Sequence, residues 1–396
     1  MTRRVVSGMR PTGGLHLGHL RGVLQNWRML QESGDECFFF VADWHALTTE
    51  YAEPEDLAAR ARELAATWTA VGIDPSRAVI FRQSDVPAHA ELCVLLSMVC
   101  PLPWLSHMPT YKELRNEGRR DLDTLGFLSY PLLQSADIML YAADCVPVGE
   151  DQLPHLEFAR EIARRFNRFY GRTESFRTAR EAAAKIIGKD TDDQLRARQT
   201  AFTEKGDREA LQSALNDIDG MSVSAEDKKV LRDDVRFGGA EILRAPEALL
   251  TETPKLPGID GRKMSKSYDN AIEIFDPPKT VSTKLARMQT DPARVRRNDP
   301  GNPDNCPVWP LHQVFSDSET QEWVGRGCRS AEIGCVDCKK QLAGFINAEL
   351  APILERREEA EKPGVADDIL SDGAKRAQRV AEETMSAARR AMGIIR

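Results

Sequence analysis

Near its amino end the chain reads Val5-Val6-Ser7-Gly8-Met9-Arg10-Pro11-Thr12-Gly13-Gly14-Leu15-His16-Leu17-Gly18-His19, and this stretch decides the fold. The two valines predict a buried strand, and the glycines and proline after them predict a loop that leads into a helix. His16 and His19 are three residues apart and are expected on one face of the first helical turn, where free backbone N–H groups favour an oxyanion. Gly18 between them would let a flat ring approach the backbone.

A second informative stretch, Lys263-Met264-Ser265-Lys266-Ser267, lies far along the chain. Its two lysines provide mobile positive charge, which suits a triphosphate whose charge grows in the transition state. Together and in this order, the two stretches indicate a nucleotide-binding α/β enzyme that attacks the α-phosphate of ATP and releases pyrophosphate. The alternative is a surface helix with two exposed histidines and an unrelated basic loop.

Short apolar runs alternate with helical patterns through the first half of the chain. Strands are expected at the start of the chain and over residues 37–42, 78–81 and 145–149, with helices over 54–71, from 88 onward and over 130–140. This alternation predicts a doubly wound parallel sheet of Rossmann type. Ligands in such a sheet bind beyond the carboxyl ends of the strands.

The composition is that of an ordinary globular protein, with 41% hydrophobic and 29% charged residues. The 54 basic and 61 acidic residues give a net charge of −7, which neither indicates nor excludes a nucleic-acid partner, because local patches decide binding. No apolar run approaches the roughly 18 residues of a membrane span. The first residues lead straight into a strand without a signal peptide, so we expect a cytoplasmic protein and no membrane partner.

Residues 172–239 differ from the sequence on either side, since they are polar, helix-favouring and poor in aromatic residues. They predict an inserted helical unit, with one helix capped near Ser224 and assisted by Glu226. Four segments follow: a nucleotide-binding catalytic domain (1–171), the insertion (172–239), the rest of the catalytic domain (240–275) and a mostly helical remainder (276–396). The last segment ends in a long amphipathic stretch over 374–392.

The eight cysteines form two groups. Cys37, Cys93, Cys100 and Cys145 lie singly in apolar stretches and are expected to be small core residues. The other four, which lie close together in the sequence, are Cys306, Cys328, Cys335 and Cys338. Four thiolates are ligands for zinc or for an iron–sulfur cluster, and disulfides are disfavoured in a reducing cytoplasm.

Several stretches resemble the bacterial tryptophanyl-tRNA synthetases, which belong to class I of the aminoacyl-tRNA synthetases. Besides the two already quoted, these are Ala42-Asp43-Trp44-His45-Ala46, Tyr130-Pro131-Leu132-Leu133-Gln134-Ser135-Ala136-Asp137 and Val146-Pro147-Val148-Gly149-Glu150-Asp151-Gln152. The resemblance implies activation of L-tryptophan with ATP and Mg²⁺, transfer of the tryptophanyl group to tRNA(Trp), and a homodimer. It also implies that 276–396 holds a helical anticodon-binding domain.

The same resemblance assigns roles to residues of the quoted stretches. His16, His19, Lys263 and Lys266 would be catalytic. The nucleotide would be bound by Arg10, Pro11, Thr12, Gly18, His19, Gly149, Glu150, Asp151, Lys263, Met264, Ser265, Lys266 and Ser267. Tryptophan would be bound by Tyr130, Gln134, Asp137, Val146, Val148 and Gln152. Because the tryptophan carboxylate is itself the nucleophile, positioning and charge stabilisation would suffice for the first step.

Asp137 falls on the carboxylate that reads the indole ring in this family. The indole N–H is a donor only, so a fixed acceptor satisfies it, whereas phenylalanine would leave that buried acceptor unpaired. Gln134 and Val6 depart from one familiar branch of the family, which leaves the walls of the pocket open. Asp43-Trp44-His45 has two interpretations: a group that binds substrate or magnesium, or a structural corner behind the ATP loop.

Some members of the family carry a 4Fe–4S cluster on cysteines spaced like Cys306, Cys328, Cys335 and Cys338, which favours that cluster here over zinc or free thiols. The cluster would order its segment, because aminoacyl transfer includes no redox step. The basic residues beside it are candidate contacts to tRNA, unless they form a solvated face. They are Arg294, Arg296, Arg297, Lys339 and Lys340.

Three other functions remain open at this point. A tyrosyl-tRNA synthetase shares the fold and both signature stretches, although the cysteine spacing and Asp43-Trp44-His45 favour tryptophan. A non-catalytic tRNA-binding paralogue would have no need of intact His16, His19 and Lys263. A nucleotidyltransferase outside translation would have no need of a long helical carboxyl-terminal region.

Overall fold

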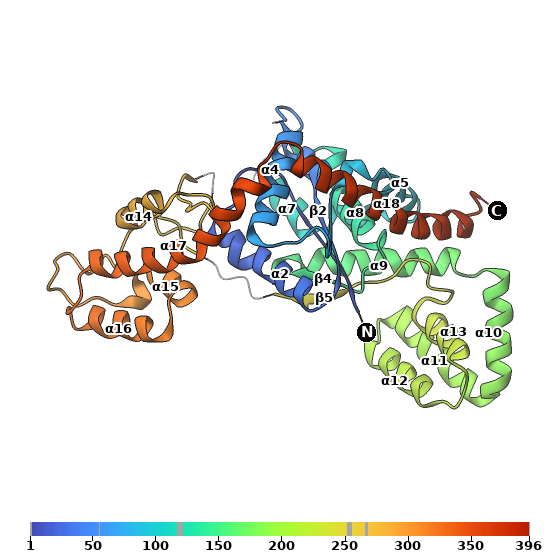
Figure 1. Ribbon diagram of the computed structural model, residues 1–396. Helices are drawn as coiled ribbons and strands as arrows, with labels where there is room; N and C mark the ends of the chain where they lie inside the picture. The colour runs from blue at the N-terminus through green and yellow to red at the C-terminus, as the bar shows by residue number, and fades with distance from the viewer. Residues whose placement is uncertain (1, 55, 117–121, 252–255, 266–267, 396) are drawn as a thin grey trace.

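The computed structural model describes the whole chain apart from residues 1, 55, 117–121, 252–255, 266–267 and 396. Its centre is a five-stranded parallel sheet in the order β3-β2-β1-β4-β5 (Figure 1). The strands are β1 (Arg4–Met9), β2 (Glu36–Val41), β3 (Ala78–Arg82), β4 (Cys145–Val148) and β5 (Glu247–Leu250). The predicted doubly wound sheet is therefore confirmed, and β5 is a strand that the sequence patterns did not predict.

The sheet is buried on both faces, as a parallel sheet requires. β1 and β2 pair from Arg4↔Glu36 to Met9↔Val41, and alternate residues face opposite sides. Phe39 lies in one apolar core, stacked on Trp27 at 4.2 Å, while Phe38 lies in the other. Two separate cores thus hold the central strands in place.

Helices fill both faces of the sheet. They are α2 (Gln25–Glu32), α3 (Asp43–Glu50), α4 (Leu57–Val71), α5 (Ala88–Ser97), α6 (Leu102–Ser106), α7 (Pro109–Asn116), α8 (Leu125–Met139) and α9 (Leu153–Tyr170). Of the lone cysteines, Cys37 and Cys145 are buried as expected, whereas Cys93 and Cys100 are half-buried against the second core.

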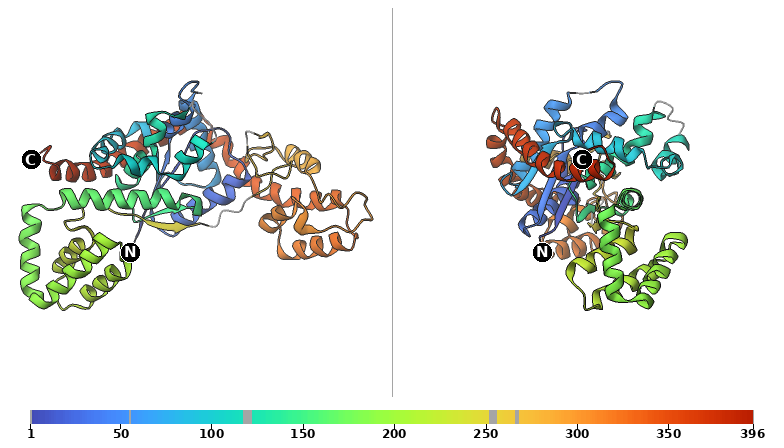
Figure 2. Two further views of the ribbon diagram at one scale, coloured as in Figure 1. Left: turned by 180° about the vertical axis from the view of Figure 1, so that it is seen from behind. Right: turned by 90° about the vertical axis from the view of Figure 1, so that its right-hand side faces the viewer.

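Residues 172–239 contain four helices that pack on one another. They are α10 (Glu174–Ile187), α11 (Lys189–Lys205), α12 (Arg208–Gly220) and α13 (Ala225–Phe237), which enclose a small apolar core. Ser224 caps α13 by accepting the N–H of Asp227, which confirms the predicted helix start. A buried Arg180 pairs with Asp192 and Asp234 between the helices. Figure 2 shows the four helices at the end of the molecule opposite α14–α16.

The carboxyl-terminal helices are α14 (Pro278–Arg287), α15 (Trp309–Phe315), α16 (Ser318–Arg329), α17 (Cys335–Ala360) and α18 (Val365–Ala391). The last of these returns to the sheet and crosses β3. At the crossing, a side chain on Gly373 would lie 1.7 Å from the carbonyl oxygen of Ile80, so only glycine fits. The segment 276–396 therefore includes a helix that packs on the sheet. None of the helices in the described residues combines the length and apolar character needed to cross a bilayer.

Candidate active site

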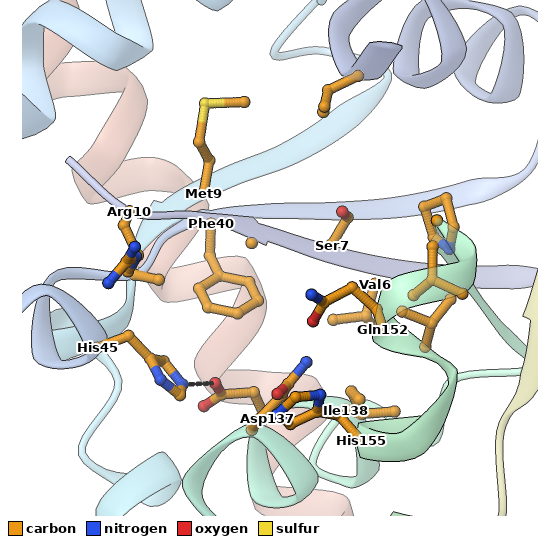
Figure 3. A pocket seen from close by; sticks show the side chains of 18 of the residues that line it. Val6, Ser7, Met9, Arg10, Phe40, His45, Asp137, Ile138, Gln152 and His155 are labelled. Atoms are coloured by element: carbon orange, nitrogen blue, oxygen red, sulfur yellow. Dashed lines mark hydrogen bonds and ion pairs between the residues drawn. The ribbon is translucent and has the colours of Figure 1, made fainter. Parts of the chain in front are cut away.

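A cavity of about 610 Å³ lies at the carboxyl ends of the strands, as expected for this kind of sheet (Figure 3). β1, β2 and β4 line it together with α3, α8 and the histidine-bearing helix. Nine residues assigned by resemblance share this one cavity. They are Arg10, His19, Tyr130, Gln134, Asp137, Val146, Val148, Gly149 and Gln152. Val6, which the sequence left open, also lines it.

Asp137 lies at the base of the cavity with only 1% of its surface exposed, and both of its carboxylate oxygens accept hydrogen bonds. Its Oδ1 accepts bonds from Gln83 Nε2 at 2.8 Å and His89 Nδ1 at 2.6 Å. Its Oδ2 pairs with His45 Nε2 at 2.8 Å, the dashed contact in Figure 3. Burial raises the pKa of Asp137, but the bonds from His45 and His89 outweigh it and hold the pKa at about 2. The carboxylate is therefore charged at neutral pH.

Three of the residues that surround Asp137 were not predicted. Gln83 follows the end of β3, His89 lies on α5, and Tyr141 follows α8 with its hydroxyl 2.7 Å from His89 Nε2. The position of Gln83 just beyond a strand's carboxyl end was a usable signal, because that edge binds ligands. His89 carried no such signal, since it sits within an ordinary helical pattern.

In the stretch Asp43-Trp44-His45, the first residue has a structural role and the last lines the cavity. The carboxylate of Asp43 accepts the N–H groups of Trp44 and Ser84 at 3.1 Å each, which makes it a structural corner. His45, two residues on, lines the cavity and bonds to Asp137. One residue of the three therefore belongs to the site.

Tyr130 also enters the cavity, from α8. Its hydroxyl lies 2.6 Å from Nε2 of His155, a buried histidine whose pKa is lowered, first of all by burial. A neutral His155 accepts the tyrosine O–H at this nitrogen, and the free lone pairs of the tyrosine oxygen are then available to a donor in the cavity. His155 was not predicted from the sequence.

The two histidines of the first stretch are arranged differently from the expected helical turn. His16 is the N-cap of α1 (Leu17–His19), and a π-helical turn, Leu20–Leu24, follows before α2. The Nδ1 of His16 accepts the N–H of Gly18, and the His16 N–H donates to Nδ1 of His19. The close approach that Gly18 permits is therefore that of the His16 ring, 2.9 Å from where a side chain would begin.

Both imidazoles are neutral at physiological pH. Burial, followed by the nearby charges of His19 and Lys263, lowers the pKa of His16 to about 3. Burial and Lys263 lower the pKa of His19 to about 4. Lys263, from the second sequence stretch, is close enough to both rings to lower their pKa values.

Two antiparallel backbone bridges bring the second sequence stretch close to the first. His16 is bridged to Glu273, and Pro257 to Lys263, so the second stretch folds back on the first. The side chain of Lys263 is exposed, whereas Met264 is buried in the core and only its backbone can face a ligand. The N–H of Ser265 donates to Asn270. The predicted ligands Lys266 and Ser267 lie outside the described residues.

The remaining predicted nucleotide ligands lie in two loops. Thr12 and Pro11 follow β1, where the Thr12 N–H donates to the carbonyl of Arg10 at 2.9 Å. Gly149 follows β4, and a side chain there would lie 2.8 Å from Oδ1 of Asp151. The carboxylates of Glu150 and Asp151 are exposed, and Asp151 accepts a bond from Nε2 of Gln152.

The four predicted metal ligands lie near one another in the helical segment. Burial, then the charges of Cys306, Cys335 and Cys328, raises the pKa of the Cys338 thiol to about 12. Nε2 of buried His312 lies 3.3 Å from Sγ of Cys338. All four are free thiols. However, no group of three or more histidine, cysteine, aspartate or glutamate side chains within the described residues is arranged to hold a metal ion.

Two of the predicted tRNA contacts are wrong. Arg294 and Lys339 are each only 9% exposed. Arg294 donates to the carbonyls of Arg297 and Ile333, and Lys339 donates to those of Ala286 and Met288. These cations stabilise the loop structure beside the cysteines and cannot reach an external partner. Arg296, Arg297 and Lys340 are exposed and remain candidates.

Comparison with known proteins gives consistent matches along the chain. Residues 2–190 and 228–351 match the family described as tRNA synthetases class I (W and Y). The unmatched residues between them fall within the helical insertion.

Two relatives are both named tryptophan–tRNA ligase. The Ralstonia nicotianae protein is 50% identical over 99% of this chain and 98% of its own, and the Thermotoga maritima protein is 45% identical over 99% of each. Among solved structures, tryptophanyl-tRNA synthetase from Campylobacter jejuni complexed with ADP and tryptophan matches with a TM-score of 0.72 and 28% identity, over 98% of this chain and 99% of that one.

Proposed function

The chain belongs to the class I tRNA synthetases, within them to the tryptophan–tRNA ligases, and from this premise we propose how its cavity works. The enzyme joins the carboxylate of L-tryptophan to the α-phosphate of ATP, releases pyrophosphate, and transfers the tryptophanyl group to tRNA(Trp). In our proposal the base of the cavity binds the amino acid, and the edge next to His16 and His19 binds ATP.

Asp137 is the observation that carries the proposal. It is a charged acceptor at the base of an otherwise largely apolar pocket, which suits the single N–H donor of an indole ring. Val146 and Val148 of β4 would pack against the ring, while Gln134 and Gln152 would complete the walls. The free lone pairs of the Tyr130 hydroxyl would accept from the substrate's ammonium group, which leaves the carboxylate to face ATP.

The nucleotide end would act by positioning and by charge. Nδ1 of each imidazole accepts a backbone N–H, so Nε2 of each neutral ring can donate to a phosphate oxygen without a proton being transferred. Arg10 and Lys263 would add positive charge, with Lys266 and Ser267 completing the same loop. Mg²⁺ stabilises charge on the phosphates of ATP and takes oxygen ligands, and the exposed carboxylates of Glu150 and Asp151 are of that type.

We also propose that Cys306, Cys328, Cys335 and Cys338 hold a 4Fe–4S cluster, with zinc as the alternative. The donor set is that of such a cluster, and buried Arg294 places a positive charge beside Cys328, with Nη1 at 3.8 Å from Sγ. Burial raises the pKa of the Cys328 and Cys338 thiols, and the charge of Arg294 offsets part of this rise at Cys328. Iron analysis and a brown colour in an anaerobic preparation would support the cluster, and a colourless protein with one zinc per chain would support the alternative.

The helical segment α14–α17 would bind the anticodon region of tRNA(Trp). Exposed Arg296, Arg297 and Lys340 are the basic residues that support this role.

A homodimer is proposed on α5 and α6, where Val94, Met98 and Leu102 are large apolar side chains exposed to solvent. Light scattering of a Met98→Asp variant against the unmodified protein tests it. A cytoplasmic location is proposed with the family.

ATP–pyrophosphate exchange tests the function as a whole. Exchange should depend on tryptophan and should not be supported by tyrosine. Exchange with tyrosine alone would make the chain a tyrosyl-tRNA synthetase, and exchange with neither amino acid would favour the non-catalytic paralogue.

A further inference from the structure

The hydrogen bonds at Asp137 are unevenly divided between its two oxygens. Among the residues that the structure describes, Oδ1 accepts two bonds, from Gln83 and His89, whereas Oδ2 accepts one, from His45. Each carboxylate oxygen readily accepts two hydrogen bonds. The capacity of Oδ1 is therefore used up by the protein, and one acceptor position remains at Oδ2.

The charge of Asp137 fixes the direction of the bond from His89. An ionised carboxylate only accepts, so Nδ1 of His89 must carry hydrogen. The other ring nitrogen, Nε2, lies 2.7 Å from the Tyr141 hydroxyl, so the same ring is bonded to both Asp137 and Tyr141. Tyr141, His89 and Asp137 are all buried, and each has a hydrogen-bond partner in this arrangement.

His89 and Tyr141 do not line the cavity, whereas His45 and Asp137 do. The buried pair can therefore influence a ligand only through the carboxylate. The positions of His89 and Tyr141 are fixed by packing. Both side chains are 0% exposed, and both rings pack against Phe81.

We propose that Tyr141 and His89 are positioning residues that hold Asp137 so that Oδ2, shared with His45, offers its one remaining acceptor position to the indole N–H. The proposal rests on the function proposed above. In this proposal, selection of tryptophan depends on the hydrogen-bonded residues Tyr141, His89 and Asp137 together with His45, and not on Asp137 alone. Without the bond from His89, Oδ1 regains a free position and the carboxylate can rotate, so the acceptor is no longer fixed.

The test uses a ligand that differs from tryptophan at this one bond. 3-(3-Benzothienyl)alanine has a sulfur atom in place of the indole N–H and otherwise nearly the same shape. Its inhibition constant against tryptophan would be measured by ATP–pyrophosphate exchange, beside KM and kcat for tryptophan. The variants are His89→Leu, which removes the donor, and His89→Asn, whose amide places an N–H near the original Nδ1. Tyr141→Phe removes only the hydroxyl and guards against misfolding of His89→Leu.

We expect KM for tryptophan to rise about tenfold in His89→Leu and about threefold in Tyr141→Phe, with kcat little changed. The inhibition constant of the benzothienyl analogue should stay within about twofold. His89→Asn should restore most of the affinity for tryptophan. Ser135→Ala is the matched control, because its buried hydroxyl lies on α8 but bonds to the Pro131 carbonyl and not to Asp137.

Equal losses for tryptophan and for the analogue in His89→Leu would overturn the proposal, because they would show a general packing defect. An unchanged KM for tryptophan in both His89→Leu and Tyr141→Phe would overturn it as well. Failure of the proposed function looks different: the unmodified protein would then show no tryptophan-dependent exchange at all.

Discussion

The two ends of the cavity are built in opposite ways. At the amino-acid end, Asp137 is buried and its hydrogen bonds to three side chains are already formed without a ligand. At the end that we propose for the nucleotide, the two imidazoles are neutral, and positive charge is carried by the exposed side chain of Lys263. Discrimination between similar side chains needs a fixed acceptor, whereas a triphosphate can be bound by side chains that move. In the proposed function, selectivity and catalysis therefore depend on different residues.

The largest effect is expected at the fixed end. Asp137→Asn should lower kcat/KM for tryptophan by about 10³-fold, because the amide cannot accept from all three donors and leaves buried groups unpaired. Exchange kinetics with circular dichroism as a folding check would measure it. Asp85→Asn is the control, because Asp85 pairs with Arg82 outside the cavity. A loss below tenfold would mean that another residue reads the indole.

The mobile end should respond in a different parameter. Lys263→Met should reduce kcat of exchange by about 10²-fold and leave the affinity for tryptophan unchanged, because the lysine acts on charge that develops at the phosphates. Tryptophan binding to the variant can be followed by calorimetry without ATP. Lys279→Met, on the exposed surface of α14, is the control. If Lys263→Met weakened tryptophan binding as much as kcat, the separation of the two ends would be lost.

A third prediction contrasts the cavity with the cysteine segment. Cys335→Ser should abolish metal binding and lower Tm, because metal ligation contributes to folding. Exchange should change by less than about threefold, since this segment supplies no residue lining the cavity. Cys93→Ser, a half-buried cysteine packed on the second core, should keep the metal content unchanged. Equal metal content in the two variants would contradict the proposed ligand set.

The smallest expected effect is on the stability of the protein at acidic pH. The pKa values of His16 and His19 are lowered from 6.5 to about 3 and about 4, so the unfolded chain binds protons first as the pH falls. Their contribution to stability is therefore complete above pH 6.5 and is lost progressively towards pH 4 for His19 and pH 3 for His16. His19→Asn should flatten the dependence of the unfolding free energy on pH between 6.5 and 4. If the unfolding free energy of His19→Asn depended on pH as steeply as that of the unmodified protein, the conclusion that His19 is neutral in the folded state would be contradicted.

Local patterns in the sequence predicted most of the framework. The apolar runs of β1 to β4 and the loop before His16 are encoded within a few residues each, and so is the cap at Ser224. β5 was missed because Glu247–Leu250 lacks β-branched residues and becomes a strand only through pairing with β4. The π-helical turn after His19 likewise has no local signature.

The site was predicted less completely, for a physical reason. Asp137 could be assigned from its own segment, but the donors Gln83 and His89 come from separate parts of the chain and meet it only after packing. Burial had the same effect on charge: Arg294 and Lys339 look like surface cations in the sequence, yet both donate to buried carbonyls. The composition tells which charged residues are present, but it does not tell which of them are buried.

A crystal structure with tryptophan bound would show directly whether Asp137 reads the indole ring. We expect the indole nitrogen within about 2.7–3.2 Å of Asp137 Oδ2, with Gln83 and His89 still bonded to Oδ1. An indole ring bound away from Asp137, or a carboxylate that gives up His89 to accept it, would contradict a fixed acceptor at the base of the cavity.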